Sequence, residues 1–208
     1  MTDIDLPCFL ARPTVPTTRG VIVIHEGMGI NTNVLHLCER LAAEGYVGVA
    51  PNLFYRTGNA KDGDWWGPID AITHDQLRVD LRAAIERLRA EGVTSVGITG
   101  FCMGGNFSYL AARWADDLGI DASVPFYGSR IVDDLGELHC PTIMFFAGDD
   151  EFVPADNVAA VEAKHGDLVT VYPHAHHSFM NEEGATFDPD AFADAWGKLL
   201  AFFDEHLA

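Results

Sequence analysis

The stretch GITGFCMGGNFSYLAARW, residues 97–114, places a cysteine between two glycines, where a short apolar run gives way to a helical pattern. Within it, GFCMG at residues 100–104 has the Gly-x-nucleophile-x-Gly form of a nucleophile elbow. Such a turn is tight, and glycines lack the Cβ that would keep strand and helix apart. The stretch therefore predicts a strand–turn–helix unit with Cys102 projecting from its apex as a candidate nucleophile.

A helix N-terminus behind Cys102 would also favour the thiolate, because free N–H groups stabilise negative charge there. The alternative interpretation is a buried cysteine beside a glycine-rich packing contact. Cys8, Cys38 and Cys140 lie far apart among apolar neighbours, and we interpret them as small buried residues. No CxxC pair indicates a zinc site or a redox dithiol.

The rest of the chain alternates between strand and helix patterns. Strands are expected at residues 20–26, 46–52, 95–100, 122–128, 141–150 and 167–178, and helices at 32–45, 73–92, 104–119, 155–166 and 189–206. This alternation predicts an α/β fold with a mostly parallel central sheet covered by helices on both faces. Functional residues are expected at the carboxyl ends of the strands. No linker or repeat divides residues 1–208, so we expect a single domain.

One connection, residues 53–72, is long for a compact domain and carries glycine, proline, aspartate, Trp65 and Trp66 without clear periodicity. Long connections of this kind often form lids or pocket walls. The two tryptophans are expected either to wall a pocket or to anchor the loop.

The composition excludes several classes of protein. The 208 residues are 48% hydrophobic, and 31 acidic residues against 13 Lys and Arg give a net charge of −18. This charge repels phosphate backbones and anionic lipids, so we expect no nucleic-acid or membrane partner. The chain has no apolar run of about 18 residues, and its first residues are acidic where a signal peptide is basic. A cytoplasmic location is expected.

A cysteine nucleophile requires a histidine to carry protons and a carboxylate to orient that histidine. FFAGDDEFVP supplies Asp149 and Asp150 after one strand, and TVYPHAHHSFMN supplies His174, His176 and His177 after the next. The order of nucleophile, acid and histidine is the one that this fold class uses. Position in the loops favours Asp150 and His177. A rival hypothesis is a metal site formed by the three histidines with Asp149.

The sequence also resembles a known family, the dienelactone hydrolases of the α/β-hydrolase superfamily. The segments that carry the resemblance, in order from about residue 21 to the C-terminus, are HEGMGIN, PNLFYR, GFCMGGN, VPFYG, GDDEFVPA and HHSFMN. The resemblance implies an α/β-hydrolase fold over most of the chain and hydrolysis of a small-molecule lactone or ester. Nothing in the sequence requires a metal or an organic cofactor, so none is expected.

The resemblance further implies roles for individual residues. The triad that it implies is Cys102, Asp150 and His177. Glu26 is then the carboxylate that contacts the thiol, and the backbone N–H groups of Gly27 and Met103 form the oxyanion hole.

The family's arginine that helps to receive the substrate carboxylate matches Arg56, and a family tyrosine near the pocket matches Tyr127. Trp65 is expected among the substrate-binding residues. The family has a second arginine four residues after the catalytic histidine, whereas this chain has Asn181 there. This departure leaves the usual dienelactone specificity open.

The expected reaction is cleavage of an enol-lactone to an open-chain acid through a thioester on Cys102. One alternative is a broader carboxylesterase or thioesterase on the same triad. Another is a ligand binder or thiol sensor without turnover, because a fold does not fix a function. The oligomeric state expected is a monomer or a weak homo-oligomer.

Overall fold

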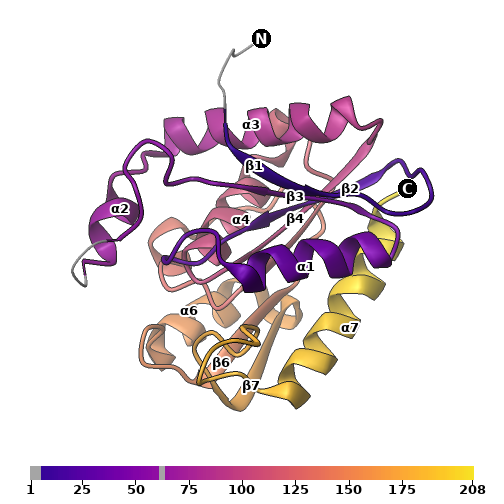
Figure 1. The fold of residues 1–208 in the computed structure, drawn as a ribbon. Coiled ribbons are helices and arrows are strands. Elements are labelled where there is room, and N and C mark those ends of the chain that lie inside the picture. The colour runs from indigo at the N-terminus through magenta and orange to yellow at the C-terminus, as the bar shows by residue number, and fades with distance from the viewer. Residues whose placement is uncertain (1–5, 61–63) are drawn as a thin grey trace.

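A computed structural model describes residues 6–60 and 64–208 and confirms the α/β fold with a mostly parallel sheet (Figure 1). In chain order the elements are β1 (Cys8–Ala11), β2 (Arg19–Ile24), α1 (Thr32–Ala43), β3 (Val47–Pro51), α2 (Trp66–Asp70), α3 (His74–Ala90), β4 (Ser95–Phe101), α4 (Met103–Arg113), α5 (Ala115–Leu118), β5 (Ala122–Phe126), the 3₁₀ turn η1 (Ile131–Asp134), β6 (Met144–Asp149), α6 (Ala155–His165), the 3₁₀ turn η2 (Gly166–Leu168), β7 (Val169–His176) and α7 (Pro189–His206).

The seven strands form one sheet in the order β1-β3-β2-β4-β5-β6-β7. Strand β1 pairs antiparallel with β3, and the other neighbours pair in parallel. Helices α1 and α7 cover one face, whereas α3, α4 and α6 cover the other (Figure 1). The parallel order brings the carboxyl ends of β2 and β4–β7 to one edge, where the functional residues are expected.

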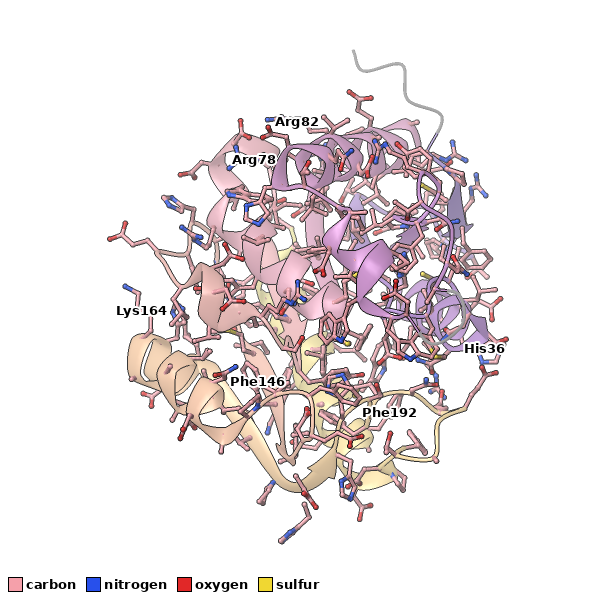
Figure 2. All side chains as sticks on the ribbon, turned by 90° about the vertical axis from the view of Figure 1, so that its left-hand side faces the viewer. His36, Arg78, Arg82, Phe146, Lys164 and Phe192 are labelled. Atoms are coloured by element: carbon pink, nitrogen blue, oxygen red, sulfur yellow. The ribbon has the colours of Figure 1, made fainter. Side chains whose placement is uncertain are left out.

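Burial follows the sequence pattern. Strands β3, β4 and β5 are buried along their whole length, as expected for strands covered on both faces. Helix α3 buries Leu77, Leu81 and Ile85 on one stripe, and its N-terminus is closed by a capping box between Thr73 and Gln76. Figure 2 shows Phe146 inside the molecule, whereas Arg82 and Lys164 lie at its surface.

Three details differ from the sequence expectation. An N-terminal edge strand, β1, is present where the pattern indicated no element. The helix expected at 104–119 is broken at Trp114, whose ring packs against His74 and Arg78 of α3. The long connection contains the short helix α2, and its residues 61–63 lie outside the described residues.

None of the helices in the described ranges combines the length and the apolar character needed to cross a bilayer.

Candidate active site

Cys102 forms the apex of the turn between β4 and α4. It is the N-cap residue of α4 and has a backbone φ of 55°, which residues other than glycine rarely adopt. A Cβ on Gly100 would collide with the carbonyl oxygen of Gly104, so these flanking glycines are in direct contact. The predicted close approach of strand and helix is therefore confirmed. Backbone strain of this kind, about 1–3 kcal/mol, is typical of functional sites.

Two more glycine contacts fix the first turn of α4 against the sheet. A Cβ on Gly104 would collide with the carbonyl oxygen of Ile24 in β2, and one on Gly105 with that of Phe126 in β5. Because this turn lies against the end of β2, the backbone of Met103 and the loop after β2 share one edge of the sheet. Gly27 lines the pocket there, and Met103 N–H is among the unpaired N–H groups of a helix N-terminus.

The structure brings His177 and Asp150 together at the ends of β7 and β6. Nδ1 of His177 donates to Oδ2 of Asp150 at 2.8 Å and lies 3.0 Å from Oδ1. The backbone N–H groups of Phe152 and Val153 donate to Oδ1 at 2.8 and 3.0 Å. The carboxylate is thus fixed from two sides, and it holds the imidazole in the Nδ1–H tautomer.

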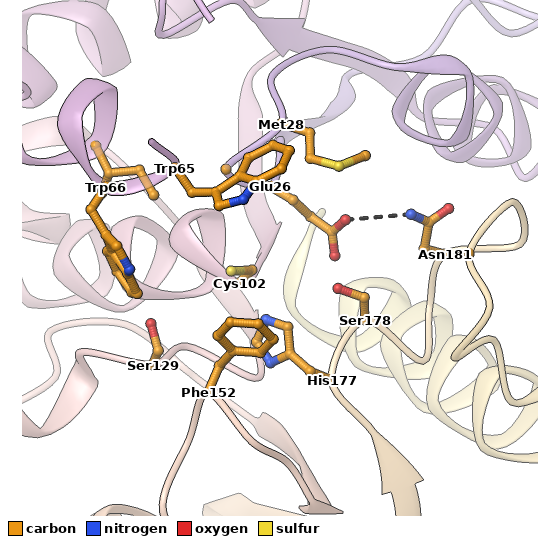
Figure 3. Close-up of a pocket in the computed structure, with 13 residues that line it drawn as sticks. Glu26, Met28, Trp65, Trp66, Cys102, Ser129, Phe152, His177, Ser178 and Asn181 are labelled. Atoms are coloured by element: carbon orange, nitrogen blue, oxygen red, sulfur yellow. Dashed lines mark hydrogen bonds between the residues drawn. The ribbon is translucent and has the colours of Figure 1, made fainter. Parts of the chain in front are cut away.

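The imidazole of His177 lies next to Cys102 (Figure 3). Burial lowers the pKa of His177, but Asp150 and Cys102 outweigh this effect and raise it to about 10. Nε2 is buried and forms no hydrogen bond of normal geometry with a described group. No described group therefore competes at Nε2 for a proton from the thiol or from water.

Glu26 lies under the pocket with 6% of its surface exposed. Its Oε1 accepts a hydrogen bond from Tyr127 Oη at 3.2 Å, and its Oε2 accepts one from Asn181 Nδ2 at 3.5 Å. Burial raises the pKa of this carboxyl group. Figure 3 shows the carboxylate turned toward Asn181 and Ser178, and no hydrogen bond to Cys102 is formed among the described residues. Glu26 and Cys102 line the same pocket, so the expected contact of this carboxylate with the thiol stays a prediction.

Tyr127 supports the site from behind and does not line the pocket. It is fully buried with a positive φ of 34°, and its ring packs edge-on against His177 at 5.0 Å between centroids. Burial, with the nearby charge of Glu26, raises the pKa of Tyr127 well above its usual value. Tyr127 thus lies near the pocket, as expected, but its hydroxyl donates to Glu26 and does not face the cavity.

A cavity of about 320 Å³ lies over Cys102. Its lining residues are Glu26, Gly27, Met28, Trp65, Trp66, Ile69, Cys102, Ser129, Phe152, His177, Ser178, Asn181 and Gly184. Trp65 and Trp66 form one wall (Figure 3). The guanidinium of Arg130 lies 4.4 Å from the Trp66 ring centre and bonds Asp70 at 2.5 Å. The tryptophans therefore wall the pocket, and Trp66 also anchors α2.

Arg56 is not brought to this pocket. Its two terminal nitrogens donate to the carboxylate of Asp80 at 2.6 and 2.7 Å, and Asp80 on α3 is fully buried. Tyr55 Oη adds a third bond to the same carboxylate at 3.1 Å. The expectation that Arg56 receives a substrate carboxylate has to be corrected, because the guanidinium is already committed to a buried acid.

The histidines proposed as a metal site diverge. His177 turns inward to Asp150, whereas Nδ1 of His176 lies 2.9 Å from the backbone carbonyl of Asp149, and His174 is exposed. In the part of the chain that the structure describes, no three His, Cys, Asp or Glu side chains are arranged to hold a metal ion.

Sequence reasoning missed some pocket residues. Phe152 is 50% exposed, and its ring centre lies 4.8 Å from that of His177. Ser129 and Ser178 also line the cavity. Two of these residues could have been found from their position in the sequence. Phe152 follows the candidate acid Asp150 by two residues, and Ser178 directly follows His177.

Comparisons with known proteins agree with this architecture. The model of the family described as "Dienelactone hydrolase family" matches residues 6–207. The chain is 38% identical over 206 residues to "Protein usf" of Aquifex pyrophilus, covering 90% of this chain and 88% of that protein. It is 29% identical over 230 residues to the "Putative carboxymethylenebutenolidase" of Yersinia pestis, covering 97% and 84%.

Among solved structures, a "Putative Dienelactone Hydrolase from Klebsiella pneumoniae" superposes with a TM-score of 0.85 at 26% identity, covering 97% of this chain and 93% of that one. The resemblance seen in the sequence is thus confirmed by family, relatives and fold. The chain belongs to the dienelactone hydrolase family and is a hydrolase with the α/β-hydrolase fold.

Proposed function

We propose that the protein hydrolyses a carboxylic ester or lactone with Cys102 as nucleophile, His177 as general base and Asp150 as the residue that orients His177. The observation that carries this proposal is the buried His177–Asp150 pair, bonded at 2.8 Å, beside a cysteine held at positive φ on a helix N-terminus. This arrangement combines a nucleophile, a base and an orienting acid.

In the reactive state Nε2 of His177 holds the proton that the thiol has given up, and the sulfur of Cys102 attacks the substrate carbonyl carbon. The N–H groups of Gly27 and Met103 stabilise the oxyanion of the tetrahedral intermediate. The carbon–oxygen bond of the substrate then breaks, and its oxygen leaves with the proton from His177. A thioester on Cys102 remains.

Water completes the cycle. His177 takes a proton from water, the hydroxide adds to the thioester carbonyl, and the carbon–sulfur bond breaks. The sulfur recovers its proton from His177, and the acid is released. An enol-lactone is a suitable substrate because the negative charge that develops on its leaving oxygen is delocalised before the proton from His177 makes it an enol.

A second candidate is a broader carboxylesterase on the same residues. It is favoured by the pocket, because no Arg or Lys is found among the described lining residues. The cytoplasmic location and the monomeric or weakly associating state expected from the sequence stay predictions.

The test is hydrolysis of an activated ester by wild type, Cys102→Ala and Cys140→Ala, with mass spectrometry of acid-quenched protein. Cys140 is the matched control, since burial raises its pKa to about 11 and makes it a poor nucleophile. We expect Cys102→Ala to lose roughly 10⁴-fold or more in kcat. An acyl adduct should map to Cys102 alone. Full activity of Cys102→Ala would refute the proposal.

A further inference from the structure

The pocket gathers the exposed apolar side chains of the protein. Large hydrophobic side chains are exposed at six described positions, and four of these, Met28, Trp65, Trp66 and Phe152, line this cavity. Exposed apolar side chains that cluster around a hollow mark a ligand site, because a soluble protein otherwise spreads them singly. The wall opposite the catalytic residues is therefore built to cover an apolar group.

The charges around the pocket disfavour an anion. Glu26 is the carboxyl group in the wall, and burial already raises its pKa, so a second negative charge beside it would be unfavourable in this poorly screened place. Arg130, which follows the pocket residue Ser129, bonds Asp70 and lies over the Trp66 ring. Arg56, which the family resemblance assigns to the substrate, is bonded to buried Asp80. A carboxylate on the acyl chain would lie near Glu26 with no Arg or Lys among the described lining residues to bind it.

We propose that the protein takes esters or lactones whose acyl part is uncharged and apolar, with an aromatic or branched group held between the tryptophan wall and Phe152. This inference rests on the proposed hydrolysis. Ser129, Ser178 and Asn181 supply the polar atoms for an ether or carbonyl oxygen of such a substrate.

The test compares two matched substrates, the mono-4-nitrophenyl ester of succinic acid and the same ester with its free carboxylate methylated. Wild type should hydrolyse the methylated ester with a kcat/KM at least about 100-fold higher, or two decades in rate. Asn181→Arg, which adds a cation beside Glu26, should reduce this ratio at least tenfold, and Asn181→Gln should not.

Binding of both esters to Cys102→Ala separates this inference from the proposed reaction. Tighter binding of the methylated ester without any turnover by wild type would uphold the acyl preference and refute the reaction. Equal binding, or preference for the free carboxylate in either assay, would overturn the inference.

A second, independent observation concerns His25 at the end of β2. The side chain is fully buried, Nε2 accepts the backbone N–H of Leu53 at 3.1 Å, and Nδ1 lies 2.7 Å from the carbonyl oxygen of Glu26. Because Nε2 accepts, Nδ1 must carry the proton and donate to that carbonyl. Burial lowers the pKa of His25 to about 4, so the ring stays neutral.

The carbonyl of Glu26 and the N–H of Gly27 belong to the same planar peptide and point in opposite directions, since no cis peptide occurs in the described residues. The N–H of Gly29 also donates to this carbonyl, at 3.0 Å. We infer that His25 is a positioning residue that fixes this peptide plane and so aims the Gly27 N–H at the developing oxyanion.

Two variants distinguish the bond that His25 Nδ1 donates to the Glu26 carbonyl from the bond that His25 Nε2 accepts from Leu53. His25→Asn keeps a donor near the Nδ1 position, and His25→Gln keeps an acceptor near Nε2 but loses the donor. We expect His25→Gln to lower kcat by about 10- to 100-fold with little change in KM, less than deletion of an oxyanion donor. A trifluoromethyl ketone that adds to Cys102 should bind more weakly by the same factor, and His25→Asn should retain kcat within about threefold.

Thermal unfolding of both variants shows whether a loss of activity is only a loss of fold. Equal losses in the two variants, or a change confined to KM, would overturn the inference. Nitrogen-15 chemical shifts of wild-type His25 give a further test that needs no variant. The Nδ1–H tautomer is required at neutral pH, and the Nε2–H tautomer would refute the inference.

Discussion

Replacing Arg56 by methionine should destabilise the fold and leave substrate choice unchanged. Asp80 is fully buried and receives bonds at 2.6 and 2.7 Å from Arg56 and at 3.1 Å from Tyr55. Removal of the guanidinium leaves a buried carboxylate with one donor. Breaking a buried pair in this way costs about 3–5 kcal/mol. Because the Arg56 side chain is 31% exposed, we expect the lower end, about 3 kcal/mol.

For a chain of this size such a loss lowers Tm by about 6–12 °C. The matched control is Arg82→Met on α3, the helix that carries Asp80. This substitution breaks an ion pair between Arg82 and Asp117 that is also 2.6 Å long, but whose side chains are 41% and 52% exposed. An exposed pair contributes at most about 1 kcal/mol. Adding Asp80→Leu to Arg56→Met removes the stranded charge and should restore most of the stability.

The assays are urea unfolding of the variants and kcat/KM for the charged and the methylated succinate esters. We expect the ratio of the two esters to change by less than twofold in Arg56→Met. A selective loss of activity on the charged ester, with unfolding free energy unchanged, would refute this reasoning and return Arg56 to the substrate site.

Three further predictions concern the catalytic residues and their support. Asp150→Asn should lower kcat by about 10⁴-fold, because the amide no longer fixes the Nδ1–H tautomer of His177; a steady-state loss below tenfold would contradict this role. Gly104→Ala should cost at least about 2 kcal/mol in urea unfolding, because its Cβ collides with a backbone oxygen. Gly197→Ala, where nothing lies within 4 Å of a new Cβ, should be neutral or stabilising. The pKa of His177 is raised from 6.5 to about 10, so its stabilising charge is fully present below pH 6.5 and lost as pH rises through 10. The difference in unfolding free energy between wild type and His177→Asn should shrink between pH 6.5 and 10. A difference that stays constant over this range would contradict the raised pKa of His177.

Local patterns predicted much of the fold. The expected helix at 189–206 is α7 (Pro189–His206), and the elbow around Cys102 has the predicted close glycine contact. These features depend on residues near one another in the chain, such as a cap, an apolar stripe or a missing Cβ. The juxtaposition of Asp150 and His177 was also foreseeable, because parallel order places the ends of adjacent strands together.

The interpretation of Arg56 failed because its partner lies on a different element. Asp80 was nevertheless visible as an anomaly: it follows Leu77 by three residues and precedes Ala84 by four, so helical spacing places it on the buried stripe. A charged residue there requires a partner, and a loop arginine is a natural one. The orientation of Glu26 had no such signal, since its partners come from loops far apart in the sequence.

The reaction and the substrate choice depend on separate parts of the fold. Strands β4 to β7 are three strand spacings apart, about 14 Å, so His177 must reach back over β5 and β6 to meet Cys102. A turn at Ser178, with φ of 62° and closed by a bond from Asn181 N–H at 2.9 Å, starts this return. The tryptophan wall instead comes from α2, which lies between β3 and α3 and is joined to the loop after β5 through Arg130. Substitutions in residues 64–70 should therefore change acyl preference while the triad geometry stays intact.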